Sequence, residues 1–145
     1  MSVVQLRRAG STDIRRLTGF LADNSLPTVG VKDCLENFFI GLDENGSWVG
    51  VAGYELYGHS ALLRSVAVDS RSRNRGHAHT LVEAVIGDAK SHGVDTVYLC
   101  TETAERYFSR LGFDSIERDQ IEPVVKNSPE FTECCRTARW MRKTL

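Results

Sequence analysis

Asp69–Gly76 is a short polar and basic stretch that could bind an anionic ligand. Its basic residues are Arg71, Arg73 and Arg75. The stretch comes directly before a helix expected from His77, so unpaired backbone N–H groups and the positive end of the helix dipole would meet there. Gly76 and Ala78 have little or no side chain, which lets a phosphate approach the backbone closely. We expect a pyrophosphate site at this loop; the alternative is a solvated basic turn that begins an ordinary helix.

Two charged residues in strand-like segments could do acid–base or anion-binding chemistry. If the substrate were an amine, it would be mostly protonated at neutral pH, so a base that removes its proton would assist reaction. Glu55 is our candidate for that base, with Glu102 as a rival; the alternative for Glu55 is a solvated carboxylate at a strand end. Arg64 lies within a hydrophobic strand, where a buried guanidinium needs an anionic partner. We predict either a substrate carboxylate or Glu55 as that partner.

Composition argues against several other functions. The chain has 145 residues, 18 of them basic and 19 acidic, with a formal net charge of -1, whereas nucleic-acid-binding proteins usually carry a basic excess. No apolar run approaches the roughly 18 to 20 residues needed to cross a bilayer, and the first residues lack the layout of a signal peptide. We therefore expect one cytoplasmic domain over residues 1–145, with a small-molecule partner and neither nucleic acid nor membrane.

The cysteines and histidines do not predict a metal site. The cysteines are Cys34, Cys100, Cys134 and Cys135. They lack the spacing of zinc ligands and the density of a disulfide scaffold, so we expect four reduced thiols. His77 and His79 are two residues apart at the start of a helix, where side chains do not share a face. We expect no bound metal.

The pattern of apolar residues predicts the elements that position these groups. The expected strands cover residues 3–8, 38–43, 47–56, 61–68, 96–101, 113–117 and 138–143, and the expected helices cover 11–24, 32–37, 77–91 and 103–111. Ser11 is expected to cap the first helix, and Asn45-Gly46 predicts a hairpin turn with both residues at positive φ. A meander followed by βαβ-like units indicates an α/β (α+β) fold: a mixed, mostly antiparallel sheet of about seven strands with about four helices on both faces.

Three landmarks in a fixed order resemble the GNAT superfamily of N-acetyltransferases. Arg73, Gly76 and Ala78 match its acetyl-CoA signature, Arg/Gln-x-x-Gly-x-Gly/Ala. Upstream, residues 63–68 look like the family's fourth strand. Downstream, Ala104-x-x-Tyr107-Phe108-x-x-x-Gly112-Phe113 looks like its last helix and the strand that follows. The resemblance covers nearly the whole chain and implies a GNAT-like fold.

The resemblance also implies a site for acetyl-CoA, which donates its acetyl group directly to an amine. The backbone at Val66, Ala67 and Val68 would bind the pantetheine arm like an added strand, and the N–H of Val66 would polarise the thioester carbonyl. The implied pyrophosphate residues are Arg73, Asn74, Arg75, Gly76, His77, Ala78 and His79. Thr101 and Phe108 complete the implied coenzyme A contacts.

Two departures from the family pattern bear on catalysis and on the cofactor contacts. Many members carry a tyrosine in the last helix that protonates the leaving thiolate, but here Phe108 occupies that position. Tyr107 comes one residue earlier, about 100° away around a helix. Tyr107 is therefore either the general acid or a core aromatic residue. Thr101 stands where asparagine is common.

Finer likenesses suggest an amino-acid acceptor. Residues 62–68, together with residues 98–101 and Tyr107-Phe108, look like the amino-acid acetyltransferase branch, which includes N-acetylglutamate synthase domains. Residues 123–138 are similar to small acetyltransferases associated with arsenic-resistance operons. These likenesses imply acetylation of a small amino acid or analogue, with Glu55 and Arg64 forming its pocket, and a homodimer as the assembly. The alternatives are a protein lysine or N-terminal acetyltransferase and a non-catalytic acyl-CoA-binding regulatory module.

Overall fold

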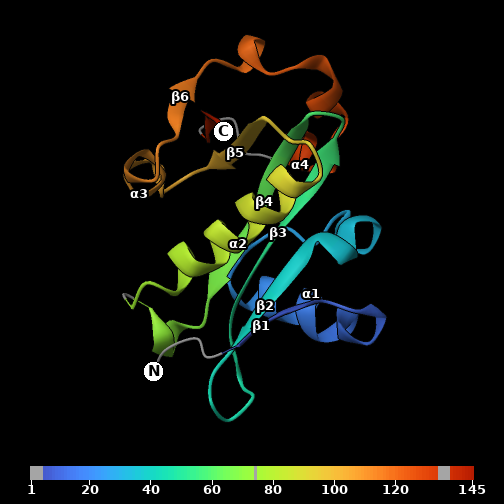
Figure 1. Ribbon diagram of the computed structural model, residues 1–145, viewed down its shortest axis with the longest axis vertical. Helices are drawn as coiled ribbons and strands as arrows, with labels where there is room; N and C mark the ends of the chain where they lie inside the picture. The colour runs from blue at the N-terminus through green and yellow to red at the C-terminus, as the bar shows by residue number, and fades with distance from the viewer. Residues whose placement is uncertain (1–4, 74, 134–137) are drawn as a thin grey trace.

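Strands of the described chain form one mixed sheet at the centre of the molecule (Figure 1). The computed structural model describes residues 5–73, 75–133 and 138–145. The strands are β1 (Gln5–Arg8), β2 (Phe38–Leu42), β3 (Trp48–Tyr57), β4 (Ser60–Val68), β5 (Thr96–Thr101), β6 (Asp114–Ile116) and β7 (Arg139–Thr144), in the spatial order β1-β2-β3-β4-β5-β7-β6. Neighbouring strands are antiparallel except β4 and β5, which are parallel. The predicted mixed, mostly antiparallel α/β sheet is confirmed.

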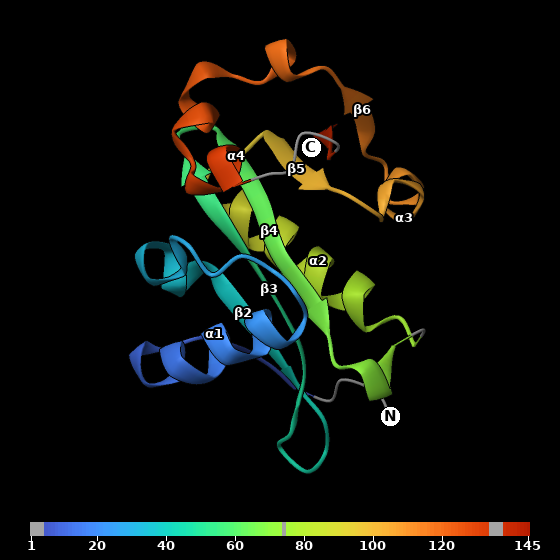
Figure 2. The same cartoon turned by 180° about the vertical axis from the view of Figure 1, so that it is seen from behind.

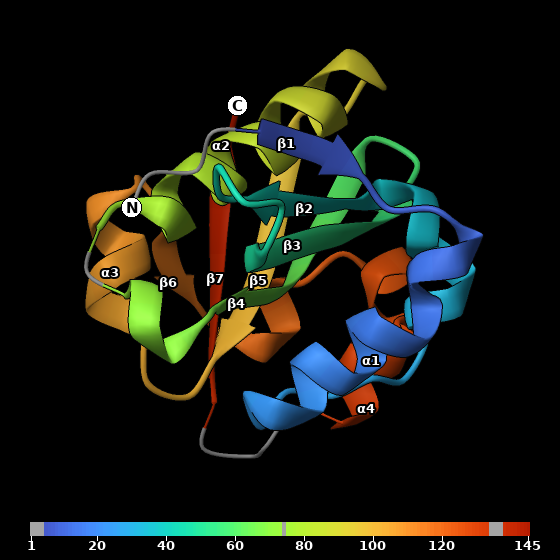
Figure 3. The ribbon, with the colours of Figure 1, turned by 90° about the horizontal axis from the view of Figure 1, so that it is seen from below.

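Helices cover both faces of the sheet (Figures 2 and 3). The α-helices of the described ranges are α1 (Ile14–Asp23), α2 (His77–Ser91), α3 (Glu105–Arg110) and α4 (Pro129–Glu133). On one face, α2 buries Leu81 and Val82 in a cluster that includes residues of β3, β4 and β5. On the other face, α1 buries Leu17 and Leu21 against β2 and β3. Among these helices, none combines the length and the apolar character needed to cross a bilayer.

Three local predictions are wrong. Ser11–Asp13 is a 3-10 turn before α1, in which Asp13 rather than Ser11 fixes the chain, because its Oδ2 accepts the N–H of Gly10 at 2.8 Å. The helix expected over 32–37 is also a 3-10 segment, Val31–Asn37. In the β2–β3 turn only Gly46 has positive φ, at 78°. The carboxylate of Asp43 instead accepts backbone N–H groups on both sides of Gly46 at 2.8 and 2.9 Å, which holds a longer turn.

Strand β4 changes partners along its length, and this change opens the sheet. Ser60, Ala61 and Leu62 pair with Thr96, Val97 and Tyr98 of β5. Beyond Leu62, β4 pairs with β3 alone. The register with β3 shifts between the pairs Gly53–Arg64 and Val51–Ala67, which is a β-bulge at Ser65 and Val66. The β5-facing backbone groups after Leu62 therefore have no strand partner.

Candidate active site

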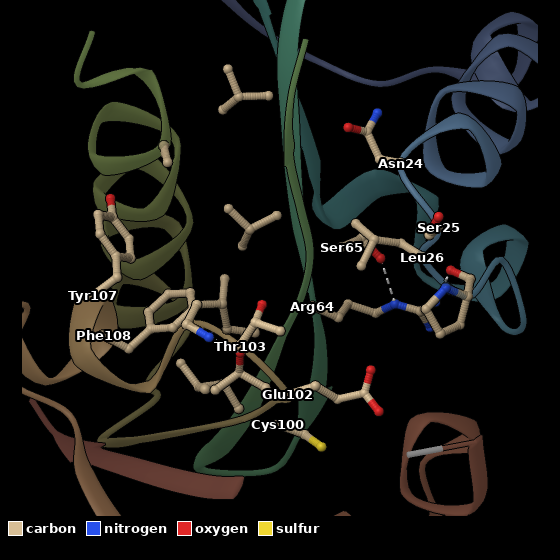
Figure 4. Close-up of a pocket in the computed structure, with 18 of the residues that line it drawn as sticks. Asn24, Ser25, Leu26, Arg64, Ser65, Cys100, Glu102, Thr103, Tyr107 and Phe108 are labelled. Carbon is tan, nitrogen blue, oxygen red and sulfur yellow. Dashed lines mark hydrogen bonds between the residues drawn. The ribbon is translucent and has the colours of Figure 1, made fainter. Parts of the chain in front are cut away.

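A cavity of about 810 Å³ lies where β4 and β5 separate (Figure 4). Its walls come from the end of α1 (residues 24–27), β4 from Leu63 onward, the start of α2 (76–78), the end of β5 with its following loop (99–104), and α3. Segments far apart in the sequence thus meet at the one place where the sheet is open. Such a gap at the carboxyl end of a parallel strand pair is a common ligand-binding position in α/β folds.

Strand β4 divides this cavity into two sides. Figure 4 shows Tyr107 and Phe108 on the side of α2. Arg64, Ser65 and the end of α1 lie on the opposite side of the strand. Two ligands could therefore approach each other from opposite faces of the sheet.

The start of α2 forms the anion-binding end predicted from the sequence. Gly76 has φ 79°, and no side chain caps the helix. The first backbone N–H groups of an uncapped helix are free to bind an anion. Gly76, His77 and Ala78 line the cavity, whereas Arg75 and His79 are exposed and do not. Asn74 lies outside the described residues.

Arg73 links the two sides of the cavity. Its Nη2 donates to Oδ1 of Asn24 at 2.9 Å, and its Nε donates to the carbonyl oxygen of Val68 at 3.2 Å. Both residues line the cavity. The guanidinium therefore ties the start of the pyrophosphate loop to the end of α1.

Tyr107 and Phe108 both line the cavity, but their side chains differ in what they offer. Phe108 is buried and packs edge-on against Phe113, with ring centroids 5.8 Å apart. The hydroxyl of Tyr107 is buried and has no hydrogen-bond partner in the described chain. Burial raises the pKa of Tyr107 above its usual value, so the phenol stays protonated at neutral pH. Tyr107 thus offers the site a buried O–H donor.

Glu55 and Arg64 form a buried ion pair. Arg64 Nη1 lies 2.7 Å from Glu55 Oε2, and the two side chains are 0% and 7% exposed. The hydroxyl of Tyr57 donates to the other oxygen of Glu55 at 2.6 Å. Of the alternatives stated for Arg64, the internal partner is the one found, and Glu55 is not a solvated carboxylate. Arg64 lines the cavity, but Glu55 does not.

The model of the acetyltransferase (GNAT) family matches residues 13–113, more than half of the chain. The chain belongs to this family. As a GNAT acetyltransferase it is an acyltransferase with acetyl-CoA as donor, so the predicted family, enzyme class and donor are confirmed.

Known proteins similar to this GNAT acetyltransferase include a sequence relative and solved structures. An uncharacterised N-acetyltransferase of Chlorobaculum tepidum is 28% identical over 96% of this chain and 93% of that protein. N-acetylglutamate synthase from Neisseria gonorrhoeae, solved with coenzyme A and N-acetyl-glutamate, has a TM-score of 0.85 at 16% identity. The match covers 100% of this chain but only 36% of that one. A Mycobacterium tuberculosis protein solved with CoA has a TM-score of 0.81 at 18% identity, over 97% of this chain and 99% of that one.

The described residues of this GNAT acetyltransferase fit acetyl-CoA. The unpaired backbone of β4 can bind an amide-bearing arm, and the uncapped start of α2 can bind a pyrophosphate. Two buried polar atoms without a partner in the described ranges, His77 Nε2 and Tyr107 Oη, belong to residues that line the same cavity. Buried polar atoms normally have partners, and a bound ligand would supply them.

The remaining predicted cofactor residues differ in their access to the cavity. Val66 and Val68 line it, but the carbonyl of Val68 already accepts Arg73. Ala67 does not line it, because its side chain packs into the cluster on the α1 face. Thr101 lines it, and its hydroxyl accepts the N–H of Ala104 at 3.0 Å, just before α3.

The cysteines only partly match expectation. Cys34 is a buried free thiol, and burial raises its pKa to about 12. Cys100 is disulfide-bonded, so the expectation of four reduced thiols is wrong there. Cys134 and Cys135 lie outside the described residues. Within the parts of the chain that the structure describes, no group of three or more His, Cys, Asp or Glu side chains could hold a metal ion.

Sequence reasoning missed the wall opposite the cofactor side. Asn24, Ser25, Leu26 and Glu130 all line the cavity, although the sequence predicted no site residue among them. The Ser-Leu-Pro stretch after α1 signals the end of a helix, but it carries no sign of which side chains the fold places next to β4. The packing of α1 against β2 and β3 brings this turn beside β4.

Proposed function

We propose that this GNAT acetyltransferase transfers the acetyl group of acetyl-CoA to the amine of a small amino acid or amino-acid-like compound. The observation that carries the proposal is the cavity that continues past β4, from a cofactor side to a second side with polar walls at Ser25, Ser65 and Glu102. A structure that shares the fold over 100% of this chain was solved with N-acetyl-glutamate beside coenzyme A, which supports an amino-acid acceptor.

The cofactor side is proposed to hold acetyl-CoA through the backbone. Amides at Gly76, His77 and Ala78 would bind the pyrophosphate, and the β5-facing groups of β4 would bind the pantetheine arm. The N–H of Val66, at the β-bulge, would point a donor at the carbonyl that becomes negatively charged during the reaction. Arg73 would hold the loop in place through Val68 and Asn24.

Glu102 is proposed to accept the proton of the acceptor ammonium. It lines the cavity, is exposed, and is not hydrogen-bonded or ion-paired to any residue that the structure describes. Figure 4 shows its carboxylate on the Arg64 side of β4. Glu55, the first candidate, has both oxygens engaged by Tyr57 and Arg64 and lies outside the cavity wall. Glu102 is therefore the better-placed base.

Tyr107 is proposed to supply the proton that leaves with sulfur. The thioester of acetyl-CoA supplies the acetyl group: its C–S bond breaks as the amide C–N bond forms, and coenzyme A departs as a thiol. Tyr107 would protonate the departing thiolate, and the phenolate left behind would take the second proton that the nitrogen loses. Its raised pKa keeps that proton available at neutral pH.

The direct test is acetylation of a panel of amines. The protein is incubated with acetyl-CoA and amino acids, their decarboxylated amines or a lysine-containing peptide, with release of free thiol and product mass as readouts. We expect thiol release and a mass gain of one acetyl group with an amino acid. Acetylation of the peptide alone would overturn the small acceptor, and thiol release equal to that without any amine would overturn amine transfer.

Glu102→Gln tests the proposed base. We expect kcat for the best amino acid to fall roughly 100-fold or more at pH 7, with an unchanged dissociation constant for coenzyme A by calorimetry. The loss should shrink at high pH, where more acceptor amine is already neutral. The exposed Glu83, on the solvent side of α2, provides the matched control as Glu83→Gln. Equal kinetics for both variants would remove Glu102 from the mechanism.

A further inference from the structure

We propose that Arg64 is a positioning residue that holds the acceptor-side wall of the cavity, with Glu55 as its counter-ion, rather than a clamp for a substrate carboxylate. The inference rests on the proposed function, because that function supplies the acceptor. It is carried by the contacts of the guanidinium, by its burial, and by the backbone conformations beside it.

The guanidinium of Arg64 connects segments that are distant in sequence. Besides the 2.7 Å pair with Glu55 of β3, its Nε donates to the hydroxyl of Ser65 at 3.0 Å. Its Nη2 donates to the carbonyl of Pro27 at 3.3 Å, and Glu130 of α4 lies 4.0 Å from Nε. Pro27, Ser65 and Glu130 all line the cavity. One side chain thus fixes the turn after α1, the bulge of β4 and the start of α4 around the same space.

The two strained backbone positions of this wall are next to those contacts. In the described chain, Ser25 and Ser65 are the non-glycine residues with positive φ, each at 60°. Such conformations are unfavourable for side chains with a Cβ and persist when neighbouring contacts hold them. Arg64 bonds the Ser65 side chain directly and bonds the carbonyl two residues after Ser25. Both serines line the cavity. The strained backbone conformations that Arg64 holds in place therefore determine the shape of the acceptor side.

Burial argues against a clamp. The side chain of Arg64 is 0% exposed, and its nearest carboxylate belongs to the protein. A substrate carboxylate would have to displace Glu55, and removal of one partner from a buried pair leaves an uncompensated charge. Tyr57 further fixes Glu55 at 2.6 Å. Arg64 therefore has an internal partner, and the substrate would contact the cavity wall that Arg64 positions instead of Arg64 itself.

Two substitutions distinguish a positioning residue from a clamp. Arg64→Met and Glu55→Gln are compared on two acceptors: the amino acid acetylated fastest in the panel, and the amine formed by removing its α-carboxylate (glutamate and 4-aminobutyrate are one such pair). We expect each variant to lower kcat/KM roughly 10- to 100-fold, by a similar factor for both acceptors. The dissociation constant of coenzyme A should change less than about twofold, because its proposed contacts lie on the other side of β4. Arg64→Lys, which keeps the charge but not the fork of donors, should fall between wild type and Arg64→Met.

A clamp gives a different pattern. Arg64→Met would then reduce only the reaction of the carboxylate-bearing acceptor, and Glu55→Gln would leave or improve it, because Arg64 would be freed for the substrate. Either result overturns the inference. The control is Arg8→Met, which breaks another arginine–carboxylate pair, with Asp88 at 2.8 Å, neither residue of which lines the cavity. It should reduce stability without selectively changing acceptor kinetics.

Two further measurements keep the inference testable if a variant folds poorly or if no acceptor is found. The double variant Arg64→Met/Glu55→Met replaces the whole pair by apolar side chains, a change that is often neutral for stability, and it should still lose acceptor kcat/KM. Amide hydrogen exchange on Arg64→Met should be at least tenfold faster at residues 25, 26, 28, 65 and 66 and unchanged in α2. Unchanged exchange there would overturn the positioning role, whereas failure of wild type on every amine overturns only the proposed function.

Discussion

At the scale of single residues, two tyrosines near the cavity stand in opposite situations. The hydroxyl of Tyr57 donates to buried Glu55 at 2.6 Å. The hydroxyl of Tyr107 is buried without a partner among the described residues. A hydrogen bond contributes to stability when it is formed, and a buried polar group costs free energy when it is not. The same chemical change at the two positions should therefore have opposite effects.

Tyr57→Phe should lower the free energy of unfolding by about 1 to 3 kcal/mol, because it leaves a buried carboxylate oxygen without a donor. Tyr107→Phe should leave that free energy unchanged or slightly higher, since it removes an unsatisfied hydroxyl. It should also weaken coenzyme A binding roughly fivefold to tenfold through loss of about 1 kcal/mol. Urea denaturation and calorimetric titration measure the two quantities. A Tyr107→Phe protein that is as destabilised as Tyr57→Phe would show that Tyr107 has an internal structural role instead.

At the scale of elements, one glycine directly before α2 and one inside it have different roles. Gly76 precedes the helix at φ 79°, and a Cβ added there meets nothing within 4 Å. Gly87 lies inside the helix with equally open surroundings. Since neither position is crowded, only backbone conformation separates the two, and alanine is unfavourable at positive φ but favourable within a helix.

Gly76→Ala should lower the free energy of unfolding by about 1 kcal/mol or force the loop to change conformation. Because the amides of this loop are proposed to bind the pyrophosphate, the affinity for coenzyme A should fall at least tenfold. Gly87→Ala should raise the free energy of unfolding by up to about 1 kcal/mol and leave that affinity unchanged. Thermal denaturation with and without coenzyme A reports both effects. Equal coenzyme A affinity in the two variants would place the pyrophosphate elsewhere.

The elements that could be predicted from the sequence are those with strong local signals. The predicted limits of α2 and β5 match the structure because an apolar stripe and a short β-branched run define them, with Gly93 between them. The predicted conformation of the β2–β3 turn was wrong because hydrogen bonds to the Asp43 carboxylate hold a longer turn than the two-residue turn that Asn-Gly favours. The bulge at Ser65 depends on strand register and does not follow from one segment alone. For Arg64 the sequence left two partners open, a substrate carboxylate and Glu55, and the burial of the Arg64–Glu55 pair decides between them.

At the scale of the whole molecule, the sheet consists of two parts that are paired only over a short stretch where β4 meets β5. Three residue pairs join these strands before they separate. Strands β1–β4 lie on one side of this junction and β5, β7 and β6 on the other. A ligand that contacts both parts at once should therefore stabilise the molecule as a unit.

Coenzyme A at about 100 times its dissociation constant should add about 2.7 kcal/mol to the free energy of unfolding. For a chain of this size that corresponds to a rise of roughly 5 to 10 °C in melting temperature. Unfolding should also remain a single transition, and the whole transition should shift to higher temperature. Differential scanning calorimetry over a ligand series checks this, with adenosine as a control that lacks the pyrophosphate. A rise of similar size with adenosine would contradict the proposed loop.

Acid should destabilise the molecule through two carboxylates. Hydrogen bonding to Arg7 lowers the pKa of Asp13 to about 2, and hydrogen bonding to Arg8 lowers the pKa of Asp88. Both folded-state values lie below those of the unfolded chain, so their stabilisation is present above about pH 4 and is lost as the pH falls toward 2. Asp13→Asn should cost up to about 1 kcal/mol at pH 7, since Arg7 is partly exposed, and should reduce the pH dependence between 4 and 2. Urea denaturation at several pH values measures this; an unchanged slope would mean that the pair forms no net interaction.

The opening beside β4 also bears on aggregation. A strand with unpaired backbone groups normally recruits strands from other chains, and proteins protect such edges. Here the unpaired stretch after Leu62 lies inside the sheet, with β5 beyond the gap and α2 packed beside it. A neighbouring chain would have to enter between these elements to pair with it, whereas a slender ligand need only slide in lengthwise. The molecule can therefore keep unpaired backbone groups on β4 for acetyl-CoA without exposing them to the strands of other copies of itself.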